Sequence, residues 1–337
     1  MNPFEEITPL LIKSIIHPSP VNTQIYNDEG ISGKNEFLFF IKPEITIPSD
    51  TIQLTKIIRL IESKINKFRL SVATIRIINA AYLKKHSIIA QHYGVINKIS
   101  ANVRKNISKD GIAKFEQLYS ESFENAEIYG SIEFLNQYPH FTPTGLSLLW
   151  QNSPTEKLAG GTYAQKLVFD GKSVYLINGF HPRQLEHFIA DDRSIVVFTL
   201  KGDISWKAAR NNFIGKTNPG EAETGSIRNE LLQRKKEFGL SEVSSSWNGV
   251  HLSAGPVEGL VELLRYNSDF ESGSLLKSGD FEFGKILDDA FGTEKMQWLI
   301  ENPTVEFNGN QISIFDLTEE LDSDVCIDTL KKVIADE

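Results

Sequence analysis

The sequence predicts an α+β fold in which a βαββαβ core is interrupted by a large insertion and followed by an extra C-terminal region. Three observations lead to this prediction. Apolar runs of strand length alternate with amphipathic segments of helix length, a long internal stretch has only a weak pattern, and the last seventy residues or so are acidic with several Gly and Ser. Without the weak stretch, the order is four strand-and-helix pairs, which fits a core of the ferredoxin-like type with additional helices.

The core domain is expected at 36–266, after an N-terminal lead-in at 1–35. The lead-in has no sustained period and contains Pro, Asn, Asp, Gly and Ser, so a short helix followed by irregular chain is expected there. The first core strand is predicted at 37–41, because FLFFI is an apolar run that suits a strand buried on both faces. Lys42-Pro43 ends this strand, and a site could open at that end.

A helix is predicted next, because apolar residues from Leu54 to Ile65 recur at helical spacing after a cap at Ser49-Asp50. The alternating stretch 68–78 predicts a strand with a bulge near Ala73. A further helix is expected through 80–93.

The insertion is expected at about 97–192, with one hairpin around Asp170-Gly171. Regular order then returns. The expected elements are a strand at 194–200, a helix at 205–213, a short strand at 248–253, a helix opened by Pro256, and a C-terminal extension at 267–337 with a strand pair at 305–315 and a final helix at 326–335.

Composition argues against several classes of function. Lys and Arg number 35 against 44 acidic residues, the net charge is −9, and no basic run is present, so a nucleic-acid partner is not expected. The one cysteine, Cys326, cannot form an internal disulfide, and no Cys/His spacing resembles a zinc site. The N-terminus does not read as a signal peptide and no apolar run reaches bilayer length, so a cytoplasmic protein without a membrane partner is expected.

Four residues are candidates for gripping phosphates: Lys42 at a strand end, Arg210 on a helix, Thr217 in a Pro-ended turn, and Arg228 after that turn. Ammonium and guanidinium groups suit polyphosphate oxygens, and a hydroxyl adds a neutral donor. The alternative for each basic residue alone is an ion pair with a surface carboxylate. Only convergence of the four would indicate a site.

The letters Gly215-Lys216-Thr217 match the end of a P-loop motif. The motif would need a glycine where Arg210 stands, and the chain continues into Asn218-Pro219-Gly220 in place of a helix. A P-loop is therefore rejected.

His251 is the candidate nucleophile. It lies between the predicted strand and helix, and a neutral imidazole nitrogen can attack phosphorus when a carboxylate holds the other nitrogen. Glu262 is the candidate carboxylate. The alternatives are a structural histidine at His251 and a solvated helix residue at Glu262.

An ordered set of motifs resembles the nucleoside diphosphate kinase family. The segments are FFIKPEI, ARNNFIGKTNPGEAETGSIR and NGVHLSAG, and they cover, with their surroundings, about 36–94 and 193–266. Arg228 follows Thr217 by 11 positions and Glu262 follows His251 by 11 positions, as the corresponding family residues do. Departures are one extra residue between Arg210 and Thr217, and Leu252 where the family has glycine.

The resemblance implies ATP or another nucleoside triphosphate and Mg²⁺ as cofactors, and phosphoryl transfer through a phosphohistidine at His251 oriented by Glu262. Lys42, Arg210, Thr217 and Arg228 would hold the phosphates, and Asn248 would hold the sugar. Ser253 matches a serine of the same motif. The counterpart of the family's nucleotide-binding tyrosine is Tyr93 or the position of Ser87, with Tyr93 preferred.

Two classes of function remain open from the sequence. The first is a phosphotransferase acting on a nucleoside diphosphate or a small-molecule acceptor, with nucleotidyl transfer to a small molecule as a variant. The second is a nucleotide-binding regulatory module that has lost turnover. The family implies a homo-oligomer, and the insertion argues against its usual hexamer.

Overall fold

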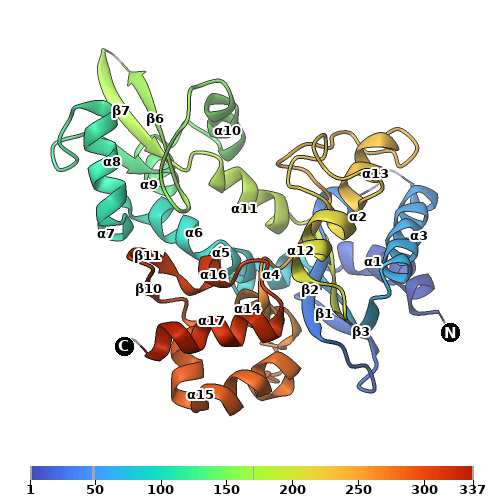
Figure 1. The fold of residues 1–337 in the computed structure, drawn as a ribbon. Helices are drawn as coiled ribbons and strands as arrows, with labels where there is room; N and C mark the ends of the chain where they lie inside the picture. Colours follow the sequence, from blue (N-terminus) through green and yellow to red (C-terminus); the bar gives the residue numbers. More distant parts are fainter. Residues whose placement is uncertain (1, 48–49, 170, 336–337) are drawn as a thin grey trace. The chain divides into compact units, whose positions relative to one another are not determined.

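The computed structural model describes residues 2–47, 50–169 and 171–335. The chain forms two compact units (Figure 1). The first contains Met1–His86 and Asp191–Glu337, and the second contains Ser87–Ala190, which overlaps most of the expected insertion.

The first unit is built on a five-stranded sheet with the order β1-β3-β8-β2-β9, in which every neighbouring pair is antiparallel. Its central strands are apolar along most of their length, and every residue of β2 is buried. The strands are β1 (Asn22–Asn27), β2 (Asn35–Ile41), β3 (Ser71–Asn79), β8 (Ser194–Gly202) and β9 (Val250–Leu252).

The two faces of this sheet have different roles. Alternate residues of a strand point to opposite faces, and Phe37, Phe39 and Ile41 join a core that includes residues of helices α1 (Pro3–Ile15) and α3 (Thr51–Lys67). Phe40 points to the other face, where its ring contacts Tyr266 of helix α14 (Pro256–Asn267). His251 is the register partner of Phe40 on β9, so it lies on this second face.

The shorter helices of the first unit connect these strands. Residues 209–214 form one π-helix (η1), which ends at Gly215, whose φ of +89° is a conformation that favours glycine. These elements are α2 (Pro43–Thr46), α4 (Ala80–Lys85), α12 (Trp206–Ala208), η1 (Ala209–Ile214) and α13 (Ile227–Gln233).

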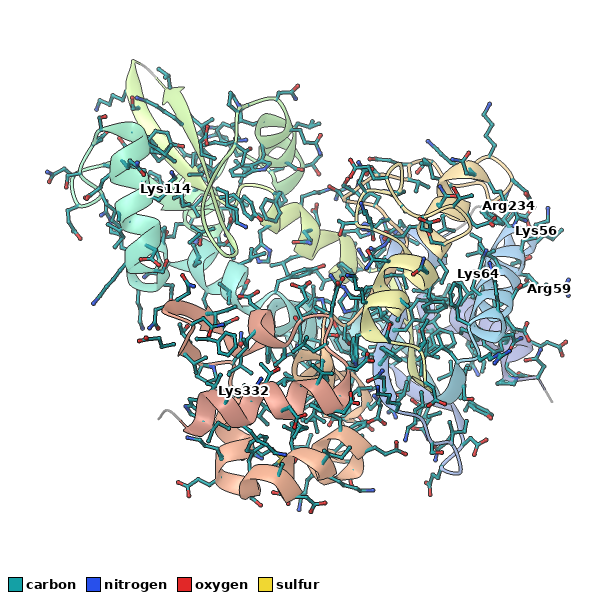
Figure 2. The ribbon with its side chains drawn as sticks, in the orientation of Figure 1. Lys56, Arg59, Lys64, Lys114, Arg234 and Lys332 are labelled. Carbon is teal, nitrogen blue, oxygen red and sulfur yellow. The ribbon has the colours of Figure 1, made fainter. Side chains whose placement is uncertain are left out.

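A buried lysine fixes the loop between η1 and α13. Lys64 on α3, labelled in Figure 2, donates from Nζ to the Gly225 carbonyl at 2.7 Å and lies 3.2 Å from Glu230. Burying an ammonium requires such partners. The loop that contains Thr217 and leads to Arg228 is thereby tied to the core helix.

The C-terminal part of the first unit is more regular than the sequence predicts. Helix α14 contacts α15, and α15 contacts α17. The elements are η2 (Ser278–Asp280), α15 (Glu282–Ile300), β10 (Thr304–Phe307), β11 (Asn310–Ser313), α16 (Ile314–Thr318) and α17 (Ser323–Ala335).

The second unit combines helices with a four-stranded mixed sheet of order β4-β7-β6-β5, in which only the β4–β7 pair is parallel. Its elements are α5 (Ile88–His92), α6 (Gly94–Ala101), α7 (Val103–Asn106), α8 (Lys109–Tyr119), β4 (Ile128–Gly130), α9 (Ser131–Gln137), α10 (Pro143–Gln151), β5 (Glu156–Ala159), β6 (Thr162–Phe169), β7 (Lys172–Ile177) and α11 (His181–Ile189).

Mixed helices and sheets are confirmed, as are most of the predicted elements. β2, β3, β8 and β9 match the four predicted core strands, and the β3–β8 register shifts between Val72 and Thr74, beside the predicted bulge. Asp50 caps α3 through its side chain, and its predicted companion Ser49 lies outside the described residues, as does Asp170 of the hairpin turn.

Three local predictions are wrong. The lead-in is not irregular, because it contains β1, the edge strand paired with β3. The single helix expected at 80–93 is interrupted at Ser87, whose φ of +52° breaks it into α4 and α5. The acidic C-terminal stretch, in which no helix is expected before 326, contains the helical segment α15, which is kinked at Gly292 with a φ of +77°.

Candidate functional site

A histidine and a glutamate form a close pair on the second face of the first unit's sheet. The Nε2 atom of His251 on β9 lies 3.0 Å from each carboxylate oxygen of Glu262 on α14. The Glu262 side chain is 2% exposed and the His251 side chain is 20% exposed. A buried carboxylate is therefore committed to the ring, while the ring itself keeps an accessible edge.

Local sequence explains how the two residues meet. Pro256 begins α14 with its backbone angle already suited to a helix, directly after the strand that carries His251. The buried stripe of α14 includes Val257, Leu260 and Leu263, which orients Glu262 towards the sheet. The eleven positions from His251 to Glu262 therefore cover the end of β9, the turn and about two turns of α14, which brings the two side chains together.

An aromatic side chain supports the histidine. The Phe40 ring stacks on the imidazole with a centroid distance of 4.5 Å and an interplanar angle of 21°. Phe40 is fully buried and also contacts the Tyr266 ring at 5.4 Å. The sequence does not identify this role, because its pattern indicates Phe40 only as part of a strand buried on both faces.

Lys42 lies just beyond the end of β2, on the same face. Its Nζ donates to Asn248 Oδ1 at 2.8 Å, and Asn248 Nδ2 donates to the carbonyls of Thr217 and Ser245, each at 3.2 Å. Burial lowers the pKa of Lys42 to about 8; Arg228 acts in the same direction, and Glu44 opposes it. The structure thus joins three of the predicted residues in one hydrogen-bonded set.

The chain before β9 is held close to Lys42 by backbone contacts. The Lys42 amide donates to the Gly249 carbonyl at 2.9 Å, and the Gly249 amide donates to a Glu44 carboxylate oxygen at 2.8 Å. Gly249 has a φ of +82°, and a Cβ there would lie 2.5 Å from a Leu231 side-chain atom. Position 249 therefore has to be glycine for Asn248 and His251 to flank it as they do.

Arg228 is buried, with 8% of the residue exposed. Its Nη1 donates to the Gly215 carbonyl at 2.8 Å and its Nη2 donates to the Val250 carbonyl at 2.9 Å. These bonds tie the end of the π-helix to the strand of His251. Arg228 supplies positive charge beside Lys42 while serving as a structural brace.

Arg210 is engaged by carboxylates from the C-terminal region. Its Nη2 lies 2.9 Å from Glu319 Oε1, and its Nε lies 3.5 Å from Glu320 Oε1. In this structure Arg210 therefore forms the ion pair with carboxylates that the sequence analysis gave as the alternative to phosphate binding.

The other predicted residues are placed as follows. Ser253 is fully buried, and its hydroxyl donates to the Leu38 carbonyl at 3.3 Å. Thr217 is exposed. Tyr93 belongs to the second unit, where it precedes α6. Ser253 is therefore bonded to β2 and not to the set formed by Lys42, Asn248 and Thr217.

A second glutamate on α14 is electrostatically linked to this region. Burial and the neighbouring Glu262 carboxylate raise the pKa of Glu258 to about 8, and Glu319 acts in the same direction. Arg210 opposes the shift. Glu258 lies one helical turn before Glu262 on α14.

The arrangement suits nucleophilic chemistry at an anionic group. A proton on Nε2, held by Glu262, leaves the lone pair of His251 on Nδ1, and the carboxylate stabilises the charge that develops on the ring when Nδ1 attacks. The neighbouring cations Lys42 and Arg228 favour an anion here.

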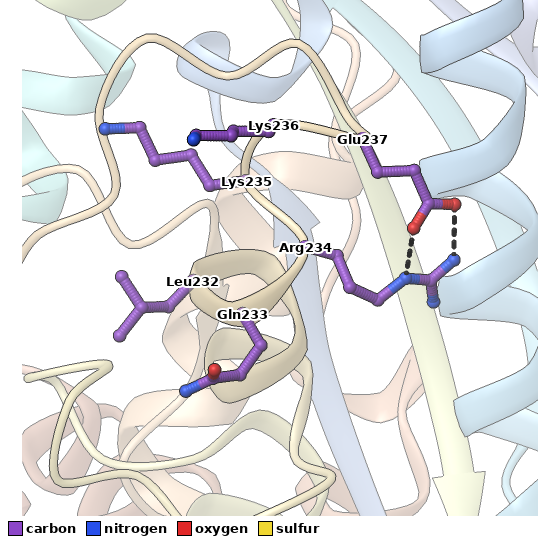
Figure 3. Close-up of a pocket in the computed structure, with 6 residues that line it drawn as sticks. All are labelled: Leu232, Gln233, Arg234, Lys235, Lys236 and Glu237. Atoms are coloured by element: carbon purple, nitrogen blue, oxygen red, sulfur yellow. Dashed lines mark hydrogen bonds and ion pairs between the residues drawn. The ribbon is translucent and has the colours of Figure 1, made fainter.

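A shallow hollow on the first unit is lined by Leu232–Glu237 (Figure 3), and none of the candidate residues lines it. Among the residues that the structure describes, no helix combines the length and apolar character needed to span a bilayer.

No protein-family model matches the chain, and no curated protein matches it. Two solved structures are similar at low identity. An apo nucleoside diphosphate kinase from Encephalitozoon cuniculi is 14% identical over 75% of this chain and 99% of its own, with a TM-score of 0.31. An NDP kinase from Pyrobaculum aerophilum is 16% identical over 72% of this chain and 99% of its own, with a TM-score of 0.33. TM-scores at this level establish neither fold nor activity.

Proposed function

We propose that this protein is a nucleotide-dependent phosphotransferase that moves the γ-phosphate of ATP, or of another nucleoside triphosphate, through a phosphohistidine at His251. The observation that carries the proposal is the bond from His251 Nε2 to the buried Glu262 carboxylate on the sheet face that also presents Lys42. The carboxylate can fix the tautomer of the ring and stabilise positive charge on it, as a nucleophilic histidine requires.

The first step is attack by Nδ1 on the γ-phosphorus. The N–P bond forms as the bond to the bridging oxygen breaks, and the nucleoside diphosphate leaves with that electron pair. The Nε2 proton stays on the ring, where Glu262 stabilises the phosphoimidazole. In the second step an acceptor oxygen attacks the phosphorus, and the N–P bond breaks with its electron pair returning to Nδ1. A nucleoside diphosphate attacks as an oxyanion, whereas a hydroxyl acceptor releases its proton to solvent.

The donor set fits a polyphosphate. Lys42 is held by Asn248, Arg228 adds buried charge, and Arg210 becomes available when its carboxylate partners are displaced. Thr217 offers an exposed hydroxyl, and its carbonyl accepts from Asn248, the residue that would hold the sugar. Mg²⁺ would accompany the nucleotide on its phosphate oxygens and neutralise part of their charge.

We also propose that the core, 36–266 without its insertion, is of the ferredoxin-like type. The strand order β9-β2-β8-β3, antiparallel throughout, supports this, as does the position of α3 between β2 and β3 and of α14 after β9. The sequence motifs resemble those of the nucleoside diphosphate kinase family. This resemblance agrees with a core that binds a nucleotide in a kinase.

A regulatory nucleotide-binding module is the second candidate. The observation that favours it is Arg210, whose guanidinium is paired with Glu319 and Glu320. A protein that senses nucleotide would use the same grip without turnover. For the enzyme, the proposed phosphate acceptor is a nucleoside diphosphate or a small molecule. The variant in which the enzyme transfers a nucleotidyl group would place no phosphate on His251.

The test is incubation of the protein with Mg²⁺ and ATP labelled on the γ-phosphate. Label that is stable to alkali and lost in acid is expected on the parent chain and on His140→Ala, a control at an exposed histidine, and not on His251→Ala. Label that persists in His251→Ala would refute the mechanism. Nucleotide binding with no label on any variant would favour the regulatory module or nucleotidyl transfer.

A further inference from the structure

The segment 318–322, from the last residue of α16 to the residue before α17, lies against the loop that follows His251. The Glu320 amide donates to the Ala254 carbonyl at 2.9 Å. A Cβ at Gly255 would lie 2.4 Å from the Thr318 carbonyl oxygen, so only glycine admits this approach. The C-terminal segment is therefore fitted to the turn between β9 and α14.

This segment carries two carboxylates onto one arginine. Glu319 Oε1 lies 2.9 Å from Arg210 Nη2, and Glu320 Oε1 lies 3.5 Å from Arg210 Nε. The side chain of Glu319 is 44% exposed, that of Glu320 is 33% exposed and that of Arg210 is 27% exposed. Asn211 Nδ2 also donates to Glu320 Oε1 at 3.4 Å. A guanidinium recognises carboxylate and phosphate oxygens with the same fork of N–H donors, so the two carboxylates occupy groups that a phosphate would use.

Arg210 also acts on α14, the helix that carries Glu262. Its charge lowers the pKa of Glu258 while Glu319 raises it, so both side chains lie close enough to α14 to affect a residue one turn from Glu262. The backbone bond from Glu320 to Ala254, three residues after His251, also brings these contacts beside the chain that joins His251 to Glu262.

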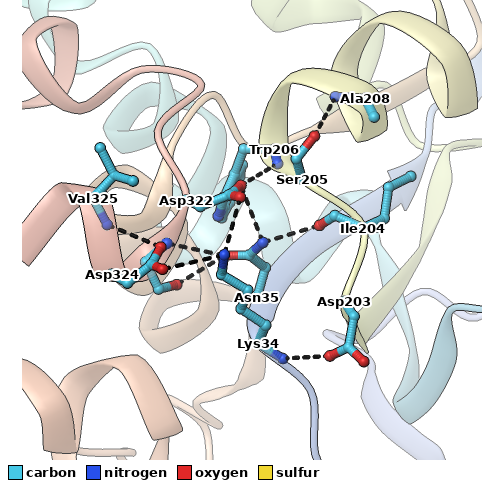
Figure 4. Close-up of polar contacts among 11 residues, drawn as sticks. Lys34, Asn35, Asp203, Ile204, Ser205, Trp206, Ala208, Asp322, Asp324 and Val325 are labelled. Carbon is cyan, nitrogen blue, oxygen red and sulfur yellow. Dashed lines mark hydrogen bonds and ion pairs between the residues drawn. The ribbon is translucent and has the colours of Figure 1, made fainter.

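Other contacts fasten the segment to the unit, as Figure 4 shows. Asp322 Oδ1 accepts from the Trp206 amide at 2.8 Å and from Asn35 Nδ2 at 3.2 Å, and Asn35 Oδ1 accepts from the Ser323 amide at 3.0 Å. Lys34 adds ion pairs to Asp322 and Asp324. Because these bonds and the Glu320 backbone hold the chain, the side chains of Glu319 and Glu320 are not needed for docking.

We propose that residues 318–322 form an autoinhibitory strap in which Glu319 and Glu320 occupy Arg210 until the phosphates of a nucleotide displace them. The proposal rests on the phosphate grip proposed above. It makes nucleotide affinity depend on two acidic side chains that do not contribute to phosphoryl transfer. An agent that draws the strap away from Arg210 would activate the protein.

The test compares the parent with Glu319→Gln/Glu320→Gln, using calorimetric titration with Mg²⁺ and the β,γ-imido analogue of ATP. Neutral amides keep the shape and lose the charge, so affinity is expected to rise about fivefold, the equivalent of one partly exposed ion pair. Adding Arg210→Gln to this variant should remove the gain. Glu237→Gln, which breaks the comparably exposed Arg234–Glu237 pair of Figure 3, should leave affinity unchanged.

Three results would overturn the strap. Equal affinity of the parent and the double variant would show that the carboxylates do not compete with phosphate. A gain that survives Arg210→Gln would place the competition elsewhere. Failure of every variant to bind the analogue would refute the phosphate grip and the strap with it. Glu319→Gln alone, at an exposed side chain, serves if the double variant has a lowered Tm.

Discussion

The imidazole of His251 and the carboxylate of Glu262 meet through Nε2, with 3.0 Å to each carboxylate oxygen. The contact selects the tautomer in which Nε2 carries the proton and Nδ1 is the nucleophile. It also places the negative charge where it stabilises a charged ring without blocking attack from the opposite nitrogen. These two consequences underlie the first prediction.

Glu262→Gln is expected to slow labelling of His251 by about a hundredfold, the lower range for loss of a positioned acid–base partner. The amide preserves the shape but cannot stabilise positive charge on the ring. Single-turnover labelling with γ-labelled ATP measures the rate. Because a structural role would act through folding, the Tm of the variant is measured beside it; an unchanged rate would contradict the assignment.

Nucleotide affinity is expected to fall as pH rises through about 8. Lys42, whose pKa is lowered to about 8, loses its positive charge there, and Glu258, whose pKa is raised to about 8, gains a negative one. Both changes weaken anion binding. Titration with the imido analogue from about pH 6.5 to about pH 9.5, which brackets both pKa values, is the measurement. Lys42→Arg keeps its charge over this range and should flatten the profile; a drop unaffected by that change would exclude Lys42 as its source.

The raised pKa of Glu258 also has a consequence for stability. The folded chain binds this proton between the usual glutamate value and about 8, whereas the unfolded chain has released it, so Glu258 makes the free energy of unfolding fall as pH rises across that interval. Glu258→Gln removes the titration. Urea unfolding at about pH 5 and about pH 9 should show a smaller decrease for the variant, and an equal decrease would contradict the shift.

The sequence predicts the parts of the site that depend on local pattern. The apolar run of β2 puts Lys42 at a strand end, and the stripe of α14 with its spacing from β9 pairs His251 with Glu262. The sequence does not predict β1, because β1 lies at the edge of the sheet and its sequence, NTQIYN, is largely polar. Ser87 gives no local sign of its left-handed conformation, because a positive φ is uncommon for serine.

Contacts between distant segments are the part that the sequence does not predict. The Lys42–Asn248 bond joins residues 206 positions apart, and the Arg210–Glu319 bond joins residues 109 positions apart. Nothing in either neighbourhood specifies the partner. Several acidic residues of the C-terminal region could satisfy Arg210 equally well by charge, and only the docking of α16 and α17 selects Glu319 and Glu320.

Arg228→Lys is expected to lower the free energy of unfolding by about 1–3 kcal/mol, the cost of leaving a buried carbonyl unsatisfied. A lysine cannot bond both the Gly215 and Val250 carbonyls with the planar fork that Arg228 uses. Urea unfolding measures the change. Arg234→Lys, at an exposed ion pair, is the matched control and should change stability by less than about 0.5 kcal/mol; equal effects would refute the bracing role.

Gly255→Ala tests the fit between the strap and the turn after His251. The added methyl would lie 2.4 Å from the Thr318 carbonyl oxygen, so residues 318–322 have to move away. Overpacking of this kind costs about 1–3 kcal/mol. Gly279→Ala is the control, since a Cβ there meets no atom within 4 Å.

Limited proteolysis should cut Gly255→Ala within the strap faster than the parent or the control, and binding of the imido analogue should tighten in the same variant. Faster cleavage with unchanged affinity would show that the strap can leave its place without freeing Arg210 for a nucleotide, which contradicts the autoinhibitory contact.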